Sequence, residues 1–310
     1  MNRRVVGVLF VAAATLASCH REAAPTAAPR VLPRVAPTTT STTTAPTTTT
    51  APPPPRPDFS ATTSADPAAA AAGIAAAERA TLDPATSPDV VHAAGWALEL
   101  GYRRIGALDP SFQQAVAAAL PDDGLRQALA FNVDAVRQLL ALGTSHATAP
   151  PASWHIVAVA GTDELLKDYH DAAAATGVPW EVLAGIHLVE TKLGRVVGDS
   201  SAGAQGPMQF LPTTWARYGQ GDIHANRDAI MGAARYLAAN GAPARLGDAL
   251  LHYNPTAKYV NAVMDYAQRL VLNANAYRGY HEWQVIYRTA TGNLLLPEGW
   301  PAVPASPLNH

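Results

Sequence analysis

Glu190 is the residue whose sequence context most clearly favours chemistry. It lies near the end of a helix predicted over residues 180–193, with Pro179 at its start and Gly194 at its end. The same face of that helix also carries Leu183, Ile186 and His187. A largely apolar face and the negative end of the helix dipole both raise the pKa of a carboxyl group. A carboxylic acid that stays protonated near neutral pH is what a general acid for a glycosidic bond requires.

A lone glutamate near a helix end is usually structural or solvated, so the segments that follow it decide its interpretation. The first of them reads Gly203-Ala204-Gln205-Gly206-Pro207-Met208-Gln209-Phe210. Gly203 and Gly206 allow the backbone to approach a sugar closely. Gln209 offers a donor and an acceptor, which suits hydroxyl or acetamido groups. Met208 and Phe210 would alternate across an extended segment, so we expect one to line a groove and the other to pack inward; for Phe210 the core is favoured.

Tyr253 and Asn254 form the second segment. They end a helix predicted over residues 245–253, and Pro255 opposes its continuation. The phenol hydroxyl of Tyr253 could reach the acid or a sugar from this position. The alternative is a plain helix-end cap without chemistry.

These segments, in this order and spacing, resemble the lytic transglycosylases of the goose-type lysozyme-like superfamily. The part that resembles their catalytic glutamate segment, especially that of the membrane-bound B-type enzymes, reads Val189-Glu190-Thr191 with Gly194-Arg195. Residues 206–209 resemble the family's Gly-Leu-Met-Gln motif, and residues 253–254 its Ala-Tyr-Asn motif. The resemblance covers residues 178–270 and implies a lysozyme-like α-helical catalytic domain.

The chain departs from the family pattern at three positions. Pro207 stands where leucine is usual, which removes one backbone donor and stiffens the loop. Thr191 replaces serine, and His252 replaces alanine. A solvated or packed His252 is favoured over one that titrates near the groove. None of these changes removes the essential acid.

The resemblance implies a route with one carboxyl group, whereas most glycoside hydrolysis uses two. Glu190 would protonate the oxygen between N-acetylmuramic acid and N-acetylglucosamine, and the substrate's own acetamido group would trap the cationic centre. Glu190 would then take the proton of the muramyl C6 hydroxyl as that oxygen attacks C1, which leaves a 1,6-anhydromuramic end. The residues implied to bind the substrate are Ser200, Met208, Gln209, Tyr253 and Asn254.

Two alternatives stay open. A muramidase of the same fold would add water and would be favoured by Asp199 placed opposite Glu190. Goose-type lysozymes carry an aspartate at the position of Ser200. The family's transglycosylases carry serine there, as this chain does, and this tilts the prediction away from hydrolysis. The other alternative is a non-catalytic wall-binding lipoprotein that holds glycan without cutting it.

The composition is compatible with one or two modest domains. The chain has 310 residues, 48% of them hydrophobic, and a formal net charge of -2. Near-neutral charge argues against nucleic acid as a partner. The 10 histidines show no ligand spacing and there is only 1 cysteine, so we expect no metal site and no cofactor.

Residues 1–19 resemble a lipoprotein signal peptide. A basic start precedes an apolar run at residues 5–16 that is too short to span a membrane. The sequence Leu16-Ala17-Ser18-Cys19 resembles the lipobox of bacterial lipoproteins. This predicts a lipid anchor at Cys19 and a location in the cell envelope, outside the cytoplasm; an ordinary cleaved signal peptide is the alternative. The predicted partners are the membrane and peptidoglycan glycan strands, with cell-wall or division proteins as further candidates.

The pattern along the rest of the chain predicts a mainly α fold. The Thr/Pro-rich residues 20–66 are predicted to be a disordered linker. A helical scaffold domain is expected at 67–150, with helices at 68–81, 88–105, 111–120 and 123–142. The lysozyme-like domain is expected at 151–275, with further helices at 162–177, 213–218, 229–239 and 257–272. Residues 276–310 are predicted to hold a β-hairpin with strands at 284–289 and 294–296.

Overall fold

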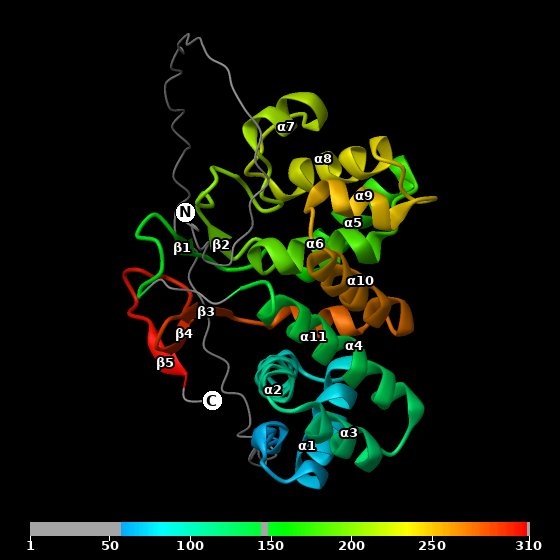
Figure 1. Cartoon of the computed structure of the whole chain (residues 1–310), viewed down its shortest axis with the longest axis vertical. Helices are drawn as coiled ribbons and strands as arrows, with labels where there is room; N and C mark the ends of the chain where they lie inside the picture. The colour runs from blue at the N-terminus through cyan, green and yellow to red at the C-terminus, as the bar shows by residue number, and fades with distance from the viewer. Residues whose placement is uncertain (1–56, 144–147, 309–310) are drawn as a thin grey trace, which may run out of the picture. The chain divides into compact units, whose positions relative to one another are not determined.

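The computed structural model describes residues 57–143 and 148–308. Cys19, the predicted signal peptide and most of the predicted linker lie outside the described residues. Within them the fold is mainly helical, with a small sheet near the C-terminus (Figure 1), which confirms the predicted fold class at this level. Across these two ranges, none of the helices combines the length and the hydropathy that a membrane span needs.

Four helices make up the first part of the described chain. They are α1 (Pro67–Leu82), α2 (Pro88–Ala107), α3 (Pro110–Ala119) and α4 (Asp123–Leu140). The first three begin with proline at the first helical position, where its missing N–H would have no helical partner. Asp66, Asp109 and Asp122 cap α1, α3 and α4 by accepting a backbone N–H bond. All four predicted helices are confirmed, with small differences at their ends.

The described residues begin within the segment predicted as linker. Ser60–Thr63 form a short 3-10 helix, η1, that packs against α1 and α2. Phe59 is buried, and the Thr62 hydroxyl donates to the Ala97 carbonyl at 2.9 Å. Gly73 of α1 permits this approach, because a Cβ there would lie 2.5 Å from the Thr62 nitrogen. The end of the segment of low-complexity composition therefore contains an aromatic residue, Phe59, that packs in the hydrophobic core.

Seven further helices follow. They are α5 (Thr162–Thr176), α6 (Trp180–Thr191), α7 (Pro212–Tyr218), α8 (Asn226–Ala239), α9 (Leu246–Tyr253), α10 (Ala257–Leu272) and α11 (Ala276–His281). α5 ends at Gly177, whose φ of 76° is the left-handed cap that the sequence predicts. α8 begins at Asn226, three residues before the predicted start at 229, and the carboxylate of Asp228 in its first turn accepts the Asp222 N–H at 2.8 Å. α11 has no counterpart among the predicted helices.

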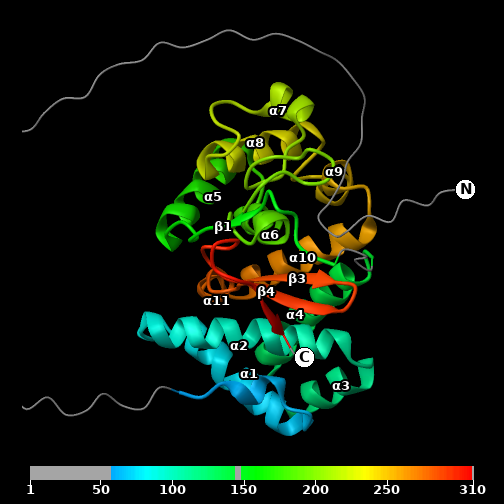
Figure 2. The same ribbon diagram turned by 90° about the vertical axis from the view of Figure 1, so that its left-hand side faces the viewer.

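α10 is the central helix of the described fold. It packs against both α4 and α6, while α5 packs against α8 (Figures 1 and 2). α2 packs against α1, α4 and α11. Buried side chains from α1 through to α11 form one hydrophobic cluster. The domain boundary at residues 150–151 stays a prediction.

Two small antiparallel sheets complete the fold. The strands β3 (Val285–Thr289), β4 (Gly292–Leu296) and β5 (Ser306–Leu308) form one sheet in that order, and β1 (His155–Ile156) pairs with β2 (Val196–Val197) in the other. The predicted hairpin is confirmed, and β5 adds a strand that the sequence did not predict. A second hydrophobic cluster joins the two sheets and consists of Trp154, Ile156, Val196, Val285 and Leu296.

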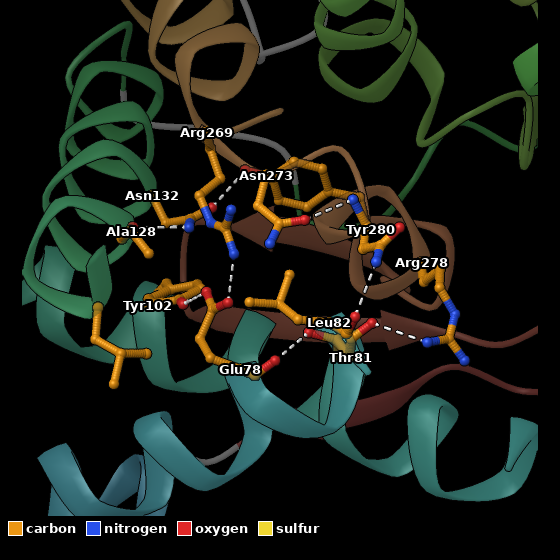
Figure 3. A network of polar contacts seen from close by, with 12 residues as sticks. Glu78, Thr81, Leu82, Tyr102, Ala128, Asn132, Arg269, Asn273, Arg278 and Tyr280 are labelled. Atoms are coloured by element: carbon orange, nitrogen blue, oxygen red, sulfur yellow. Dashed lines mark hydrogen bonds and ion pairs between the residues drawn. The ribbon is translucent and has the colours of Figure 1, made fainter. Parts of the chain in front are cut away.

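A buried ion pair links α1 to α10 (Figure 3). The side chains of Glu78 and Arg269 are 3% and 2% exposed. The Tyr102 hydroxyl, from α2, donates a further hydrogen bond to Glu78. Close by, the Tyr280 hydroxyl of α11 donates to Asn132 of α4 at 2.7 Å (Figure 3). These bonds give the packing of the helices a directional component that apolar contacts lack.

Replacing Arg269 with Met should destabilise the fold strongly, because it leaves the Glu78 carboxylate buried without its cation. We expect the free energy of unfolding to fall by about 3–5 kcal/mol, measured by urea denaturation. The double variant Glu78→Met/Arg269→Met should lose less, since no charge is left buried. Arg79→Gln is the control, because its side chain is 62% exposed and its ion pair with Asp122 is long at 3.8 Å. A loss for Arg269→Met no larger than that of the control would contradict the prediction.

Candidate functional site

Glu190 lies in the last turn of α6 and is 4% exposed. The Tyr259 hydroxyl, from the first turn of α10, donates to Glu190 Oε1 at 2.6 Å. Burial raises the pKa of the Glu190 carboxyl from 4.5 to about 7, and the hydrogen bond from Tyr259 opposes part of this rise because it favours the charged form. The carboxyl can therefore give up and take back a proton near neutral pH, as the sequence predicts for its apolar helix face.

The turn after Glu190 has a strained backbone and is held in place by hydrogen bonds. α6 ends at Thr191, before the predicted end, because Lys192, Leu193 and Gly194 have left-handed φ angles of 54°, 59° and 84°. Non-glycine residues adopt this region rarely and at an energetic cost. The Thr191 hydroxyl donates to the Pro207 carbonyl at 2.6 Å and accepts the Gly194 N–H at 3.0 Å. These bonds hold the helix end against the glycine-rich segment.

Residues 205–210 form a tight loop beside this turn. Gln205 and Phe210 exchange two backbone hydrogen bonds, each of 2.8 Å. Gly206 has a φ of 72°, and a Cβ there would lie 1.9 Å from the Ile223 carbonyl oxygen. Only glycine fits at this position, which explains the glycine in the motif by packing rather than by approach to a sugar.

Met208 lies fully buried in the hydrophobic core, so its side chain is not in the groove where we expected it. Gln209 has a φ of 50°, which means that the segment is not extended and the expected alternation does not apply. Phe210 is buried as expected, but it also lines a cavity next to Glu190. The polar contribution of Met208 is its carbonyl, which accepts a hydrogen bond from the Tyr253 hydroxyl at 2.6 Å.

Gln209 carries an acceptor that is buried and unused. Its side-chain nitrogen donates to the Gly206 carbonyl at 3.0 Å, while its Oε1 has no partner within the described part of the chain. Leaving a buried acceptor unsatisfied is unfavourable, and a ligand N–H or O–H would relieve it. Gln209 and Glu190 line the same cavity, so such a ligand would lie next to the acid.

Tyr253 and Asn254 line that cavity too, but neither is hydrogen-bonded to Glu190 in the described structure. The Tyr253 ring stacks on the Tyr259 ring, with centroids 6.4 Å apart and an interplanar angle of 6°. Asn254 is buried, and its Oδ1 accepts the Thr256 hydroxyl at 2.9 Å. Both residues therefore position the start of α10, from which Tyr259 reaches the acid.

Ser200 and Asp199 line neither of the two cavities next to Glu190. Ser200 is buried, and its Oγ accepts the Ala204 N–H at 3.0 Å, so its visible contribution is to shape the loop. Asp199 is exposed and accepts a hydrogen bond from the Gln205 side chain at 3.2 Å. The arrangement of Asp199 opposite Glu190 that a muramidase would need is not observed.

Glu190 lies between two cavities. The first, which we call the motif cavity, is lined on its other sides by Ala204, Gln209, Phe210, Leu211, Thr214, Tyr236, His252, Tyr253 and Asn254. His252 is exposed there, in agreement with a solvated histidine. The second, which we call the arginine cavity, includes in its lining Glu99, Arg103, Leu139, Trp154, Lys192, Tyr266, Trp283, Tyr287 and Arg288. Figure 2 shows β3, one of its walls, between α6 and α2.

Glu99 is the second carboxylate in the arginine cavity, and both of its oxygens are occupied. Its Oε1 pairs with Lys192 Nζ at 2.9 Å, and its Oε2 accepts the Gln284 N–H at 2.7 Å. The Lys192 ammonium also lies 4.6 Å from the centroid of the Trp283 ring. The pair holds the strained turn after α6 to α2, and both oxygens of Glu99 are engaged in contacts within the fold.

Tyr259 is the site residue that the sequence analysis missed. A helix face through Val260, Val263 and Met264 also fits core spacing, so periodicity alone does not select the tyrosine. In the structure Val260 and Met264 are only partly buried, and the buried face of α10 includes Tyr259, Ala262, Val263 and Tyr266, which recur at the same three- and four-residue intervals. The residues of the arginine cavity gave no signal either, because they come from segments far apart in the chain.

Comparisons with protein-family models, with curated proteins and with solved structures find no match to this chain. Among residues 57–143 and 148–308, no cluster of three or more His, Cys, Asp or Glu side chains has the arrangement to hold a metal ion. The geometry around Glu190 is therefore what supports a function.

The raised pKa of Glu190 predicts how stability depends on pH. The unfolded chain loses this proton near pH 4.5 and the folded chain near pH 7, so the contribution of Glu190 is fully present below 4.5 and is lost as pH rises through about 7. Relative to the parent, Glu190→Gln should gain about 3 kcal/mol of unfolding free energy between these limits, because glutamine has no proton to lose. Urea denaturation at a series of pH values measures this difference. Glu181→Gln, the same change in the first turn of the same helix, is the control for the substitution itself, and a pH-independent difference for Glu190→Gln would refute the assignment.

Proposed function

We propose that this chain is a peptidoglycan lytic transglycosylase, and that its residues 151–275 form a lysozyme-like catalytic domain. It would cleave the bond between N-acetylmuramic acid and N-acetylglucosamine and leave a 1,6-anhydromuramic end. The observation that carries the proposal is one buried carboxyl, Glu190, with a pKa of about 7, placed between two cavities. A group that must act first as an acid and then as a base works best when its pKa lies near the working pH.

The surroundings of the other acids support a single-carboxyl route over hydrolysis. Glycosidases that add water use a second carboxylate across the bond. In the described residues that line the two cavities, the other carboxylate is Glu99, and Lys192 and the Gln284 N–H occupy it. Asp199 lines neither cavity. The substrate's acetamido group would then supply the nucleophile that the protein lacks.

Tyr259 sets which oxygen of Glu190 carries the proton. Burial raises the pKa of the Tyr259 phenol well above 10, so the phenol stays protonated and donates to Oε1. In a neutral carboxyl group one oxygen accepts and the other carries the hydrogen. With Oε1 accepting from Tyr259, the proton resides on Oε2, which is the oxygen left to protonate the glycosidic bridge.

The reaction would proceed in two steps through this oxygen. In the first, Oε2 gives its proton to the bridging oxygen as the bond to muramyl C1 breaks, and the acetamido oxygen bonds to C1. In the second, the ionised carboxyl takes the proton of the C6 hydroxyl, whose oxygen bonds to C1 and displaces the acetamido oxygen. The unsatisfied Oε1 of Gln209 would accept an N–H or O–H of a sugar in the motif cavity.

The lipid anchor at Cys19 and the location in the cell envelope belong to the same proposal. A linker ahead of residue 57 would let an anchored enzyme reach glycan strands at a distance from the membrane. Peptidoglycan is then the partner of the site, and the membrane is the partner of the N-terminus. Cell-wall or division proteins stay further candidates.

Digestion of purified peptidoglycan, followed by mass spectrometry, tests the reaction. The full chain should release fragments with 1,6-anhydromuramic ends, and Glu190→Gln should lower their yield by at least about a thousandfold, because the acid is essential to both steps. Glu181→Gln, the same change at the other end of α6, should cleave like the parent. Reducing ends from the parent would make the chain a muramidase, and bound but uncut glycan would make it a binding protein.

The pH dependence of cleavage tests the role of Tyr259. Cleavage should decline as pH rises through the pKa of Glu190, about 7, because the acid loses its proton. Tyr259→Phe removes the donor that lowers this pKa, so the alkaline limb of the pH–rate profile should move to higher pH, with a roughly tenfold lower rate from lost positioning. Tyr253→Phe is the control, since that hydroxyl donates to the Met208 carbonyl. An alkaline limb that stays in place or moves to lower pH in Tyr259→Phe would exclude this role.

A further inference from the structure

The arginine cavity lies on the side of Glu190 to which the mechanism above assigns nothing. Its walls come from distant parts of the chain: α2 supplies Arg103, β3 supplies Tyr287 and Arg288, and Trp154 precedes β1. Figure 2 shows β3 lying between α6 and α2, and residues of β3 line the cavity together with the end of α6. Since Glu190 is part of the same lining, a group held there would lie next to the bond being cleaved.

The charges of this cavity are unbalanced. Glu99 is neutralised by Lys192 at 2.9 Å, and a protonated Glu190 adds no charge. Arg103 forms no hydrogen bond or ion pair with any residue that the structure describes. The Arg288 guanidinium donates one hydrogen bond within the described residues, to the Leu140 carbonyl at 3.0 Å. Burial and the nearby Arg288 lower the pKa of Arg103, which Glu99 partly offsets. Two guanidinium groups thus line one partly buried cavity, and several of their N–H donors have no acceptor within the described residues.

The rest of the lining is apolar and aromatic. Trp154 and Tyr287 meet edge to face with ring centroids 5.6 Å apart, and Leu139 and Val285 lie in the same wall. A surface of this kind suits a ligand with an aliphatic body and a carboxylate end. Guanidinium groups bind carboxylates in paired, directional hydrogen bonds, which are stronger than neutral ones.

The chemistry of the substrate limits what such a ligand can be. The sugars of a glycan strand carry hydroxyl and acetamido groups, which are neutral. Negative charge enters through carboxylates, either those of the peptide attached to the muramic lactyl group or, where the peptide has been removed, that of the lactyl group itself. A peptide also has the aliphatic side chains that the apolar wall would cover, whereas a bare lactyl group does not.

We propose that the arginine cavity binds a carboxylate of the peptide on the muramic residue next to the cleaved bond, through Arg103 and Arg288. The chain would then select peptide-bearing strands over bare ones. This assignment rests on the proposed function of Glu190. The motif cavity would hold the sugars on one side of the acid, and the arginine cavity would read the peptide on the other.

Binding measurements on a chain that does not consume its ligand test the assignment. The full chain with Glu190→Gln is titrated calorimetrically with soluble glycan oligomers that carry peptides, and with the same oligomers after an amidase has removed the peptides. We expect roughly tenfold tighter binding of the peptide-bearing oligomers, the size of effect that a lost charge-assisted hydrogen bond produces. Arg103→Gln and Arg288→Gln, each added to this background, should abolish the preference without weakening binding of the bare oligomers.

Two further variants separate recognition from folding. Arg103→Lys keeps the charge and should retain part of the preference, while Arg79→Gln removes an exposed arginine from α1 and should retain all of it. Equal weakening of both oligomers by the arginine variants, or no weakening of either, would overturn the assignment. Cleavage of peptidoglycan by the parent without any preference for peptides would refute the cavity assignment alone. Preference for peptides without cleavage would instead refute the proposed function and leave the cavity assignment standing.

Discussion

Burial away from water is what keeps the Glu190 carboxyl protonated near neutral pH, and α10, which packs on α6, contributes to that burial. The first turn of α10 places the Tyr259 hydroxyl on the carboxyl, and its last turns carry Arg269, whose partner Glu78 lies on α1. The same helix packs on α6, which bears Glu190, and on α4. The position of the acid therefore depends on packing that reaches across the described fold, and the first four helices contribute to the site as well as support it.

Local signals accounted for much of the fold. Periodicity predicted α1 to α4, whose starts carry proline at the first helical position or an aspartate cap, and a glycine with left-handed φ ends α5. These features are set by a few neighbouring residues, which is why they can be read from the chain. β5 and the pairing of β1 with β2 depend on contacts between distant segments, which leave no periodic trace in such short strands. Phe59 was missed because it lies within a segment rich in Thr and Pro that has few other apolar residues, although its neighbours in space are apolar.

The candidate site shows the same division. Glu190 and Gln209 were predicted from residue type and order, and they line one cavity. Met208 was misplaced because positive φ angles at Gly206 and Gln209 turn the segment. Tyr259 and the guanidinium groups of Arg103 and Arg288 were not predicted, because their relation to Glu190 exists only after α2, α10 and β3 have come together. Chemistry that is local in sequence could thus be predicted, and chemistry assembled by the fold could not.

The packing of η1 also decides where a mechanical load would enter the molecule. Phe59 and Thr62 are held between α1 and α2, with the Thr62 hydroxyl bonded to Ala97. A pull on the chain ahead of residue 57 is therefore resisted first at this clamp. From there the force passes into α1 and α2, and α1 is linked to α10 by the Glu78–Arg269 ion pair. If the chain were pulled from its N-terminus while it is bound to a polymer, the contacts of η1 would break before Glu190 is displaced.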